Sequence, residues 1–193
     1  DPVNARAGLA EVDLNAVPPA LRSSYDAGIA FGLGTTDEAV AAIEQAIAAP
    51  FATRQLADLG ATVIKVERPE GDFARHYDAH VHGLSSHFVW ANRGKQSVIL
   101  DLKNRVDRST FDGLVAGADV FLHNVAPGAA ARLDIDVEML ASDNVGLIAC
   151  EISGYGTDGP YRDKKAYDLL VQSEAGLLSI TGTPAVPSKV GVS

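Results

Sequence analysis

The sequence has little cysteine and no long apolar run. Cys150 is its single cysteine, so no disulfide can form within the chain, and its apolar neighbours favour a small buried thiol over a nucleophile. No apolar run is long enough to span a bilayer, and no charged segment followed by an apolar one stands at the start. We therefore expect no membrane association and a cytoplasmic location.

Basic clusters are also missing. The net charge is −9, and the Lys and Arg residues form no long run, which excludes a general nucleic-acid binder and predicts no nucleic-acid partner. An anionic ligand remains compatible with this composition, because a few local cations can hold a phosphate on an acidic protein.

Two common phosphate-binding motifs are absent as well. No G-x-G-x-x-G follows a predicted strand, since Gly154-Tyr155-Gly156 lacks the third glycine, and no G-x-x-x-x-G-K-[ST] occurs. Metal binding has weak support. His76 and His80 would share a helix face, but H-E-x-x-H is missing and glycine and serine interrupt the run. A polar loop is the favoured interpretation of this histidine cluster, and we expect no metal.

Hydrophobic residues make up 47% of the chain, enough for a real core. Short apolar strands alternate with helical patterns, which predicts an α/β fold with a parallel sheet and helices on both faces. A helix is predicted over the helix formers at 39–49, with a strand at 39–44 as the alternative. The remaining predicted strands are 62–67, 97–101, 118–123 and 146–152, and the remaining helices are 5–11, 19–30, 51–59, 104–116, 136–142 and 167–178.

Cations recur near the predicted strand ends. In parallel sheets, ligands bind beyond the carboxyl ends of the strands. Cations converging there can hold a phosphate-rich anion, whereas the alternative is that surface loops simply carry charge. The cations in question are Arg68, Arg93, Lys95 and Arg132.

Several motifs in a fixed order resemble one enzyme family. They are Ala49-Pro50-Phe51 through Val66-Glu67-Arg68-Pro69 with Gly71-Asp72, Asn92-Arg93-Gly94-Lys95, Asp101-Leu102-Lys103, Asn124-Val125-Ala126-Pro127-Gly128 with Arg132-Leu133, Ser153-Gly154-Tyr155-Gly156, Ala166-Tyr167-Asp168 and Gly182-Thr183-Pro184. From about residue 40 to 193 the chain resembles the class III CoA-transferases. This group includes carnitine and bile-acid CoA-transferases, formyl-CoA transferase and α-methylacyl-CoA racemase.

The resemblance implies a domain plan and a ligand. Residues 38–193 would form a partial, Rossmann-like CoA-binding domain, the incomplete large domain of that fold, and residues 1–37 an unassigned leader. Coenzyme A would bind as a substrate. By position, the residues that resemble CoA contacts are Arg68 and Arg132 near the nucleotide and phosphates, Asn92, Arg93 and Lys95 over the adenine, Asn124 and Val125 at a strand end, and Lys165 near the pantetheine arm.

The family's transferases use an aspartate nucleophile that forms an anhydride and then an aspartyl-CoA thioester. The resemblance places this residue just beyond Ser193, so we expect a truncated transferase with no catalytic residue in the chain. Asp168 would support the fold or the site instead. The partners implied are an acyl-CoA, a carboxylic acid acceptor and a second copy in the full-length enzyme. The chain alone would bind CoA weakly or not at all and be inactive.

Two alternatives remain open at this point. A racemase of 2-methylacyl-CoA would carry histidine before the aspartate, where this sequence has Tyr167, a poor base at neutral pH. A non-catalytic CoA-binding remnant would bind CoA without turnover. Its affinity would fall steeply when Arg68 or Arg132 becomes alanine.

Overall fold

A computed structural model describes residues 38–191, and the helices predicted at 5–11 and 19–30 lie outside this range. The described residues divide into two compact units, one ending at Ile152 and one made mainly of the residues that follow it. The predicted single CoA-binding domain over 38–193 stays a prediction.

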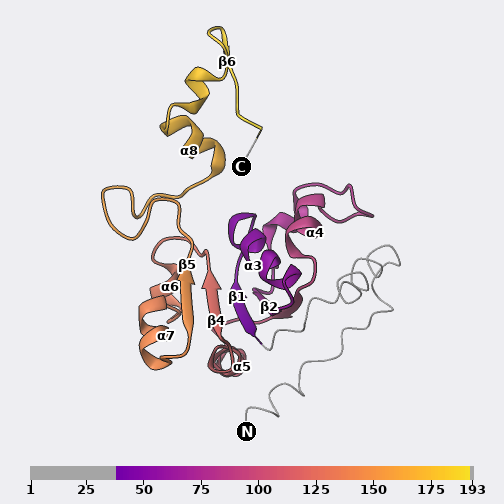
Figure 1. Cartoon of the computed structure of the whole chain (residues 1–193), viewed down its shortest axis with the longest axis vertical. Helices are drawn as coiled ribbons and strands as arrows, with labels where there is room; N and C mark the ends of the chain where they lie inside the picture. The colour runs from indigo at the N-terminus through magenta and orange to yellow at the C-terminus, as the bar shows by residue number, and fades with distance from the viewer. Residues whose placement is uncertain (1–37, 192–193) are drawn as a thin grey trace. The chain divides into compact units, whose positions relative to one another are not determined.

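The first unit holds a five-stranded parallel sheet in the order β3-β2-β1-β4-β5 (Figure 1). From β1 the chain moves outward through β2 to β3, then returns to the other side of β1 for β4 and β5. Strand order therefore reverses between β1 and β4, the position at which ligands bind in open α/β sheets. The strands are β1 (Ala39–Ile43), β2 (Thr62–Glu67), β3 (Gln96–Ile99), β4 (Val120–His123) and β5 (Ile148–Glu151).

The predicted helix over 39–49 is wrong, and the alternative strand is confirmed. Ala39–Ile43 is rich in helix formers, but it pairs with both β2 and β4 and so lies at the centre of the sheet. Pairing on two sides and burial of Val40, Ala41 and Ala42 override the local preference. A helix begins only at Ala48, with Pro50 in its first turn, where a missing backbone N–H costs nothing.

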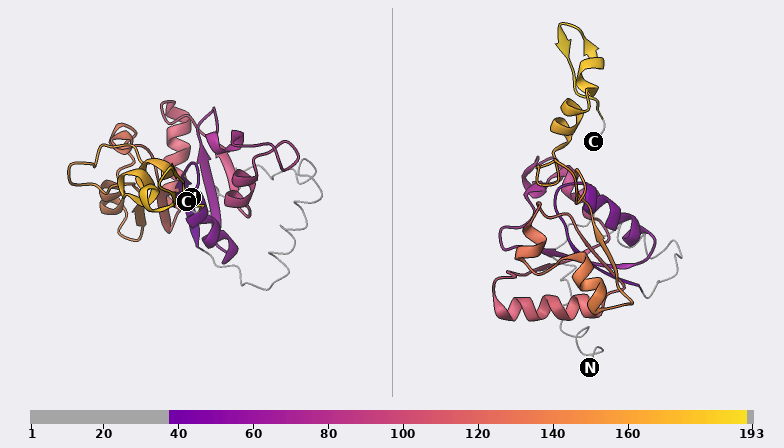
Figure 2. Two further views of the ribbon diagram at one scale, coloured as in Figure 1. Left: turned by 90° about the horizontal axis from the view of Figure 1, so that it is seen from above. Right: turned by 90° about the vertical axis from the view of Figure 1, so that its left-hand side faces the viewer.

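The other predicted elements of the first unit are confirmed with small shifts at their ends. Helices cover both faces of the sheet, and in the left view of Figure 2 α3 and α5 lie on opposite sides of β1. The helices of this unit are α3 (Ala48–Asp58), η3 (Phe73–His76), α4 (Ser86–Asn92), α5 (Arg105–Ala116), α6 (Ala129–Arg132), which begins at the unit boundary, and α7 (Val137–Asp143).

One face of the sheet is apolar. Phe111 and Val115 of α5 pack on Phe121 of β4, and the rings of Phe111 and Phe121 meet edge to face at 5.8 Å. Ile135, which precedes α7, is also fully buried in this cluster. The opposite face is different, because Lys65 and Glu67 of β2 and Glu44, directly after β1, are buried charged residues.

The second unit is small. It contains α8 (Asp168–Glu174), η4 (Leu177–Ile180) and an antiparallel pair of short strands, β6 (Gly182–Thr183) and β7 (Val186–Pro187). Gln172 is its single buried residue within the described range. The predicted helix over 167–178 is interrupted. Gly176, between α8 and η4, adopts a positive φ of 77°.

Among the described residues, no helix is long and apolar enough to cross a membrane.

Candidate functional site

The loop after β1 lies where the strand order reverses, and side chains from distant segments hold its backbone. The Asn124 side chain, just after β4, pairs with Gln45 twice: its Oδ1 accepts from the Gln45 N–H and its Nδ2 donates to the Gln45 C=O, both at 2.9 Å. Asp72 accepts from the next N–H, of Ala46, at 3.1 Å. Ala46 has a positive φ of 62°, a costly conformation for a residue with a Cβ. These three hydrogen bonds stabilise that conformation.

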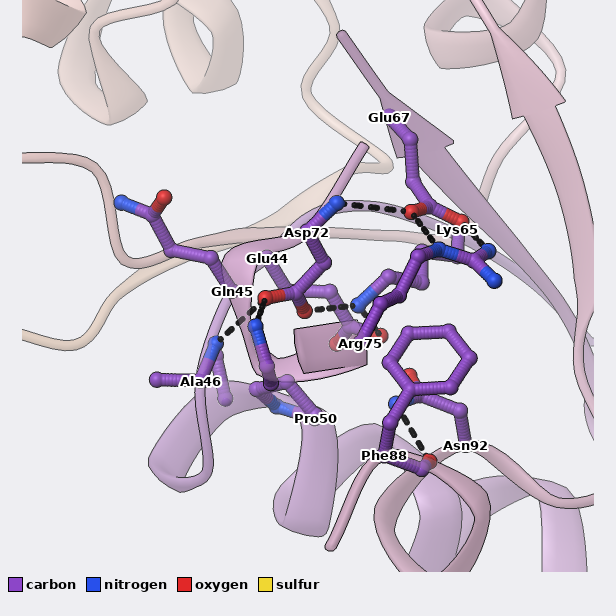
Figure 3. A network of polar contacts seen from close by, with 12 residues as sticks. Glu44, Gln45, Ala46, Pro50, Lys65, Glu67, Asp72, Arg75, Phe88 and Asn92 are labelled. Atoms are coloured by element: carbon purple, nitrogen blue, oxygen red, sulfur yellow. Dashed lines mark hydrogen bonds and ion pairs between the residues drawn. The ribbon is translucent and has the colours of Figure 1, made fainter. Parts of the chain in front are cut away.

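Below this loop lies a buried network of charged side chains (Figure 3). Lys65, in the middle of β2, bonds Asp72 at 2.8 Å and lies 3.8 Å from Glu44. Lys95 reaches the same Glu44 oxygen at 2.5 Å, and Thr53 of α3 donates to the other oxygen at 2.5 Å. Each of the four ion-paired side chains is at most 2% exposed. Since buried charges need close partners, this cluster ties β1, β2, α3 and the loop before β3 together.

A second carboxylate anchors the outer part of this network. Glu67 accepts hydrogen bonds from Arg75 at 2.6 Å, from Ser97 at 2.7 Å and from the Asp72 N–H at 3.0 Å. Burial raises the pKa of Glu67, but these bonds outweigh burial and lower it to about 2. The Arg75 guanidinium also lies 4.0 Å from the centre of the Phe88 ring. Glu67 is therefore an anion at every physiological pH.

Lys95 was predicted to contact CoA, and the structure encloses its ammonium group in protein. Besides Glu44, it donates to the Pro50 C=O at 2.8 Å and to Asn92 Oδ1 at 3.1 Å. Burial lowers the pKa of Lys95 to about 8, and the charge of Glu44 opposes that shift. In this arrangement Lys95 and Asn92 support the loop between α4 and β3.

The three predicted arginines of the first unit lie on the surface. Arg68 follows β2 and donates to the Gly71 C=O at 3.1 Å, with its side chain 58% exposed. Arg93 pairs with Asp58 of α3 at 2.7 Å. Arg132 is exposed at the end of α6. Lys95 differs from these arginines, because its side chain is 2% exposed.

The remaining predicted contacts lie in both units. Asn124 and the half-buried Val125 follow β4 beside the β1 loop. Lys165 is exposed and lies in the second unit.

In the same unit, Asp168 accepts hydrogen bonds from Gln172 and pairs with Lys189 at 3.0 Å, which together hold its pKa below the usual range. Tyr167 before it is 58% exposed. That Asp168 supports the fold or the site stays a prediction.

Sequence reasoning missed most of the buried network. The signal was available, because Lys65 stands in the middle of the apolar run Thr62–Glu67, and a lysine inside a central strand requires an acidic partner. Identifying Glu44 and Asp72 as those partners required the fold, since they come from other segments of the chain.

Two further features of the described residues bear on ligand binding. Between 38 and 191, no group of three or more His, Cys, Asp or Glu side chains is arranged to hold a metal ion.

A shallow depression of about 450 Å³ lies beside α5, lined by Lys103, Arg105, Arg108 and Asp134 among others. Arg108 already donates to two backbone carbonyls there, and none of the eight predicted CoA contacts lines it.

Comparison with known proteins identifies the family of this chain. The family model described as CoA-transferase family III matches residues 37–193. The chain is 43% identical over 144 residues to acetyl-CoA:oxalate CoA-transferase of Acetobacter aceti, covering 74% of this chain and 37% of that enzyme. It is 41% identical over 159 residues to succinate–glutarate CoA-transferase of Agrobacterium fabrum, covering 78% and 40%.

A solved structure gives the same result for the fold. The crystal structure of a CAIB/BAIF family protein from Brucella suis superposes with a TM-score of 0.73 at 37% identity, over 80% of this chain and 43% of that one. The chain spans about two fifths of the length of these relatives. The family match, the named relatives and the shared α/β fold together show that the chain belongs to CoA-transferase family III.

Proposed function

We propose that this chain forms the CoA-binding part of an enzyme that transfers CoA between an acyl-CoA and a carboxylic acid. The observation that carries the proposal is the braced loop after β1, at the point of the sheet where ligands bind, in a chain of this family. The relatives' names describe CoA transfer, and the acids in them are oxalate, succinate and glutarate. Small dicarboxylates are therefore the first acceptors to test.

Within this proposal, the residues of the first unit bind and orient CoA. Arg68 and Arg132 have exposed guanidinium groups that can pair with the nucleotide phosphates. Asn124 fixes the backbone beside which the ligand binds. Lys95 acts indirectly, because its ammonium is already bonded to Glu44.

The chemistry belongs to an aspartate. A carboxylate attacks the thioester carbonyl and releases CoA as a thiolate, which leaves an acyl anhydride on the enzyme. The thiolate then attacks the aspartyl carbonyl of that anhydride, releasing the first acid and forming an aspartyl-CoA thioester. The acceptor acid repeats these steps in reverse. We propose that this aspartate is not among these 193 residues, as the resemblance to the family implies; the chain matches only 37% and 40% of the two named relatives.

The racemase alternative has less support. Tyr167 occupies the position before Asp168, and it is exposed at the start of α8. A phenol is a poor base at neutral pH for removing a proton next to a thioester. Deuterium exchange at C2 of a 2-methylacyl-CoA would support the alternative.

CoA binding measured by equilibrium dialysis tests the proposal. We expect weak binding by the chain, reduced about tenfold or more by Arg68→Ala or Arg132→Ala, because each removes a charge-assisted contact to phosphate. Arg105→Ala is the matched control, since it removes an arginine that is also exposed and that is not among the predicted CoA contacts. Succinyl-CoA with oxalate should give no turnover. Robust transfer by the chain alone, or equal binding by all four proteins, would contradict the proposal.

A further inference from the structure

The second unit contains an irregular segment that connects β5 to α8 (Figure 1). Residues 155–165 of this segment are called the strap below. We propose that Glu174 of α8 is the latch of the strap: its carboxylate holds the two ends of the strap together, and the strap opens when those contacts are released. This inference goes beyond the proposed function, because it concerns a conformational device of the second unit and does not require that the chain bind CoA.

The strap has no buried apolar anchor. It contains no helix or strand, and every residue from 156 to 165 is exposed. The N–H groups of Arg162 and Lys164 bond C=O groups within the strap itself, so these hydrogen bonds do not attach it to the rest of the unit. Since little buried surface offsets the entropy of ordering such a segment, its position depends on contacts at its ends.

The Glu174 carboxylate joins those two ends. Tyr155, the first residue of the strap, donates from its hydroxyl to Oε2 at 2.7 Å, and Lys164, near the other end, pairs with Oε1. Each carboxylate oxygen thus has its own partner. The contacts with Lys164 and Tyr155 hold the pKa of Glu174 below its usual range, so the carboxylate is charged at neutral pH.

A second contact closes the strap at its base. Gly154 and Ala166 flank the strap and approach so closely that a Cβ added at Gly154 would lie 1.9 Å from the Ala166 Cβ. Glycine permits this approach, whereas any larger residue would push the two segments apart. The rings of Tyr155 and Tyr161 also meet edge to face at 5.5 Å. The strap therefore has the geometry of compact surface loops whose ends lie together, which are often functional elements.

The latch controls the position of an exposed cation. Lys165 follows the latched Lys164 directly and is exposed. Closing the latch fixes the backbone that carries this ammonium group, and opening the latch frees it. Because a single carboxylate joins the ends, the strap can open without unfolding the rest of the chain.

Limited proteolysis of the full chain with trypsin tests the latch, since the strap contains cleavage sites after Arg162 and after Lys165. When opening and closing are fast, the initial cleavage rate follows the population of the open strap. For Glu174→Ala, we expect cleavage at these sites to be about five- to tenfold faster, the effect of losing two partly exposed polar contacts. Helix stability would act in the opposite direction, because alanine is the better helix former and a negative charge is unfavourable at the C-terminal end of α8.

Two further variants alter the strap in other ways. Tyr155→Phe keeps the pair between Lys164 and Glu174, so it should accelerate cleavage by only about twofold. Gly154→Ala leaves Glu174 in place but forces the base of the strap apart, and it should also accelerate cleavage.

Glu138→Ala is the matched control, since Glu138 is an exposed glutamate on α7, a seven-residue helix like α8. It should leave both cleavage rates unchanged. Amide exchange of residues 168–174, followed by mass spectrometry, should not become faster in Glu174→Ala. Unchanged cleavage in Glu174→Ala would overturn the inference, because the carboxylate would then hold nothing closed. Faster cleavage accompanied by equally faster exchange in α8 would overturn it as well, because the helix itself would have opened.

Discussion

Lys65 illustrates how a single buried charge organises this site. Its ammonium group lies between the carboxylates of Asp72 and Glu44, and the side chain is 1% exposed. Burying an ammonium group is costly, so the pairing offsets a desolvation penalty more than it adds net stability. The pairing does fix the position of Asp72. The Asp72 carboxylate in turn accepts from the Ala46 N–H, and so it holds the loop at which the proposed ligand binds.

Lys65→Met should destabilise the chain by about 3–5 kcal/mol, because it leaves the buried Asp72 carboxylate without its ion-pair partner, whereas Glu44 keeps Lys95. Lys103→Met is the control, since Lys103 is exposed and its substitution should change stability by less than about 0.5 kcal/mol. Urea unfolding followed by circular dichroism measures both values. Equal stability of the two variants would show that Lys65 contributes no more than a surface lysine.

His123 is the second unusual residue at this scale. It is fully buried at the end of β4, and neither ring nitrogen has a hydrogen-bond partner. Burial lowers the pKa of His123, while the charges of Glu151 and Asp136 act in the opposite direction. The unfolded chain therefore takes up a proton on this residue at a higher pH than the folded chain.

The sign of the pH dependence follows from that difference. Because the unfolded state binds more protons, the contribution of His123 to stability is present above the unfolded pKa of 6.5 and is lost as pH falls below it. In His123→Phe, the free energy of unfolding should fall less between about pH 6.5 and 5 than it does in the unsubstituted chain. His80→Phe, at an exposed histidine, should leave the slope unchanged. Equal slopes of unfolding free energy against pH in the two variants would contradict this account of His123.

At the scale of elements, the sequence predicted most of the fold. Strand Thr62–Glu67 has the predicted bounds, and the helix Arg105–Ala116 differs by one residue, because β-branched runs and an Asn104 cap are strong local signals. Strand Ala39–Ile43 was mispredicted because its identity depends on pairing with β2 and β4, which are distant in sequence. The site was harder for the same reason. Cations near strand ends were visible, but the buried partners that fix Lys95 were not.

Helix α5 offers a test of local propensity. Gly113 lies in its interior with a helical backbone, and an added Cβ would meet no atom within 4 Å. Gly113→Ala should therefore stabilise the chain by about 0.5–1 kcal/mol, mainly by reducing the entropy of the unfolded state.

Gly94 provides the opposite case on the loop between α4 and β3. Its φ is 77°, so Gly94→Ala should destabilise the chain by about 1–2 kcal/mol even though the nearest atom is 3.4 Å from the added Cβ. Thermal unfolding of Gly94→Ala and Gly113→Ala measures both changes in stability. A stabilising Gly94→Ala, or a destabilising Gly113→Ala, would contradict the backbone geometry described above.

At the scale of the whole molecule, the two units differ in how much they bury. The first unit contains a core of fully buried side chains such as Phe111, Phe121 and Ile135. In the second unit, the described part of the chain buries Gln172 alone, and α8 exposes Leu169, Leu170 and Val171. A unit with so little buried apolar surface has little to offset the entropy of ordering its backbone.

Amide hydrogen exchange should therefore separate the two units. Amides of β1 and β4, bonded within the sheet and flanked by core residues, should exchange only through global unfolding, whereas those of α8 should exchange through local opening. We expect protection to differ by at least about two orders of magnitude in rate, since α8 has seven residues and an isolated helix of that length is unstable in water. Mass spectrometry of peptides covering 39–43, 120–123 and 168–174 would measure this. Equal protection in α8 and β1 would mean that contacts beyond those of its own unit stabilise α8.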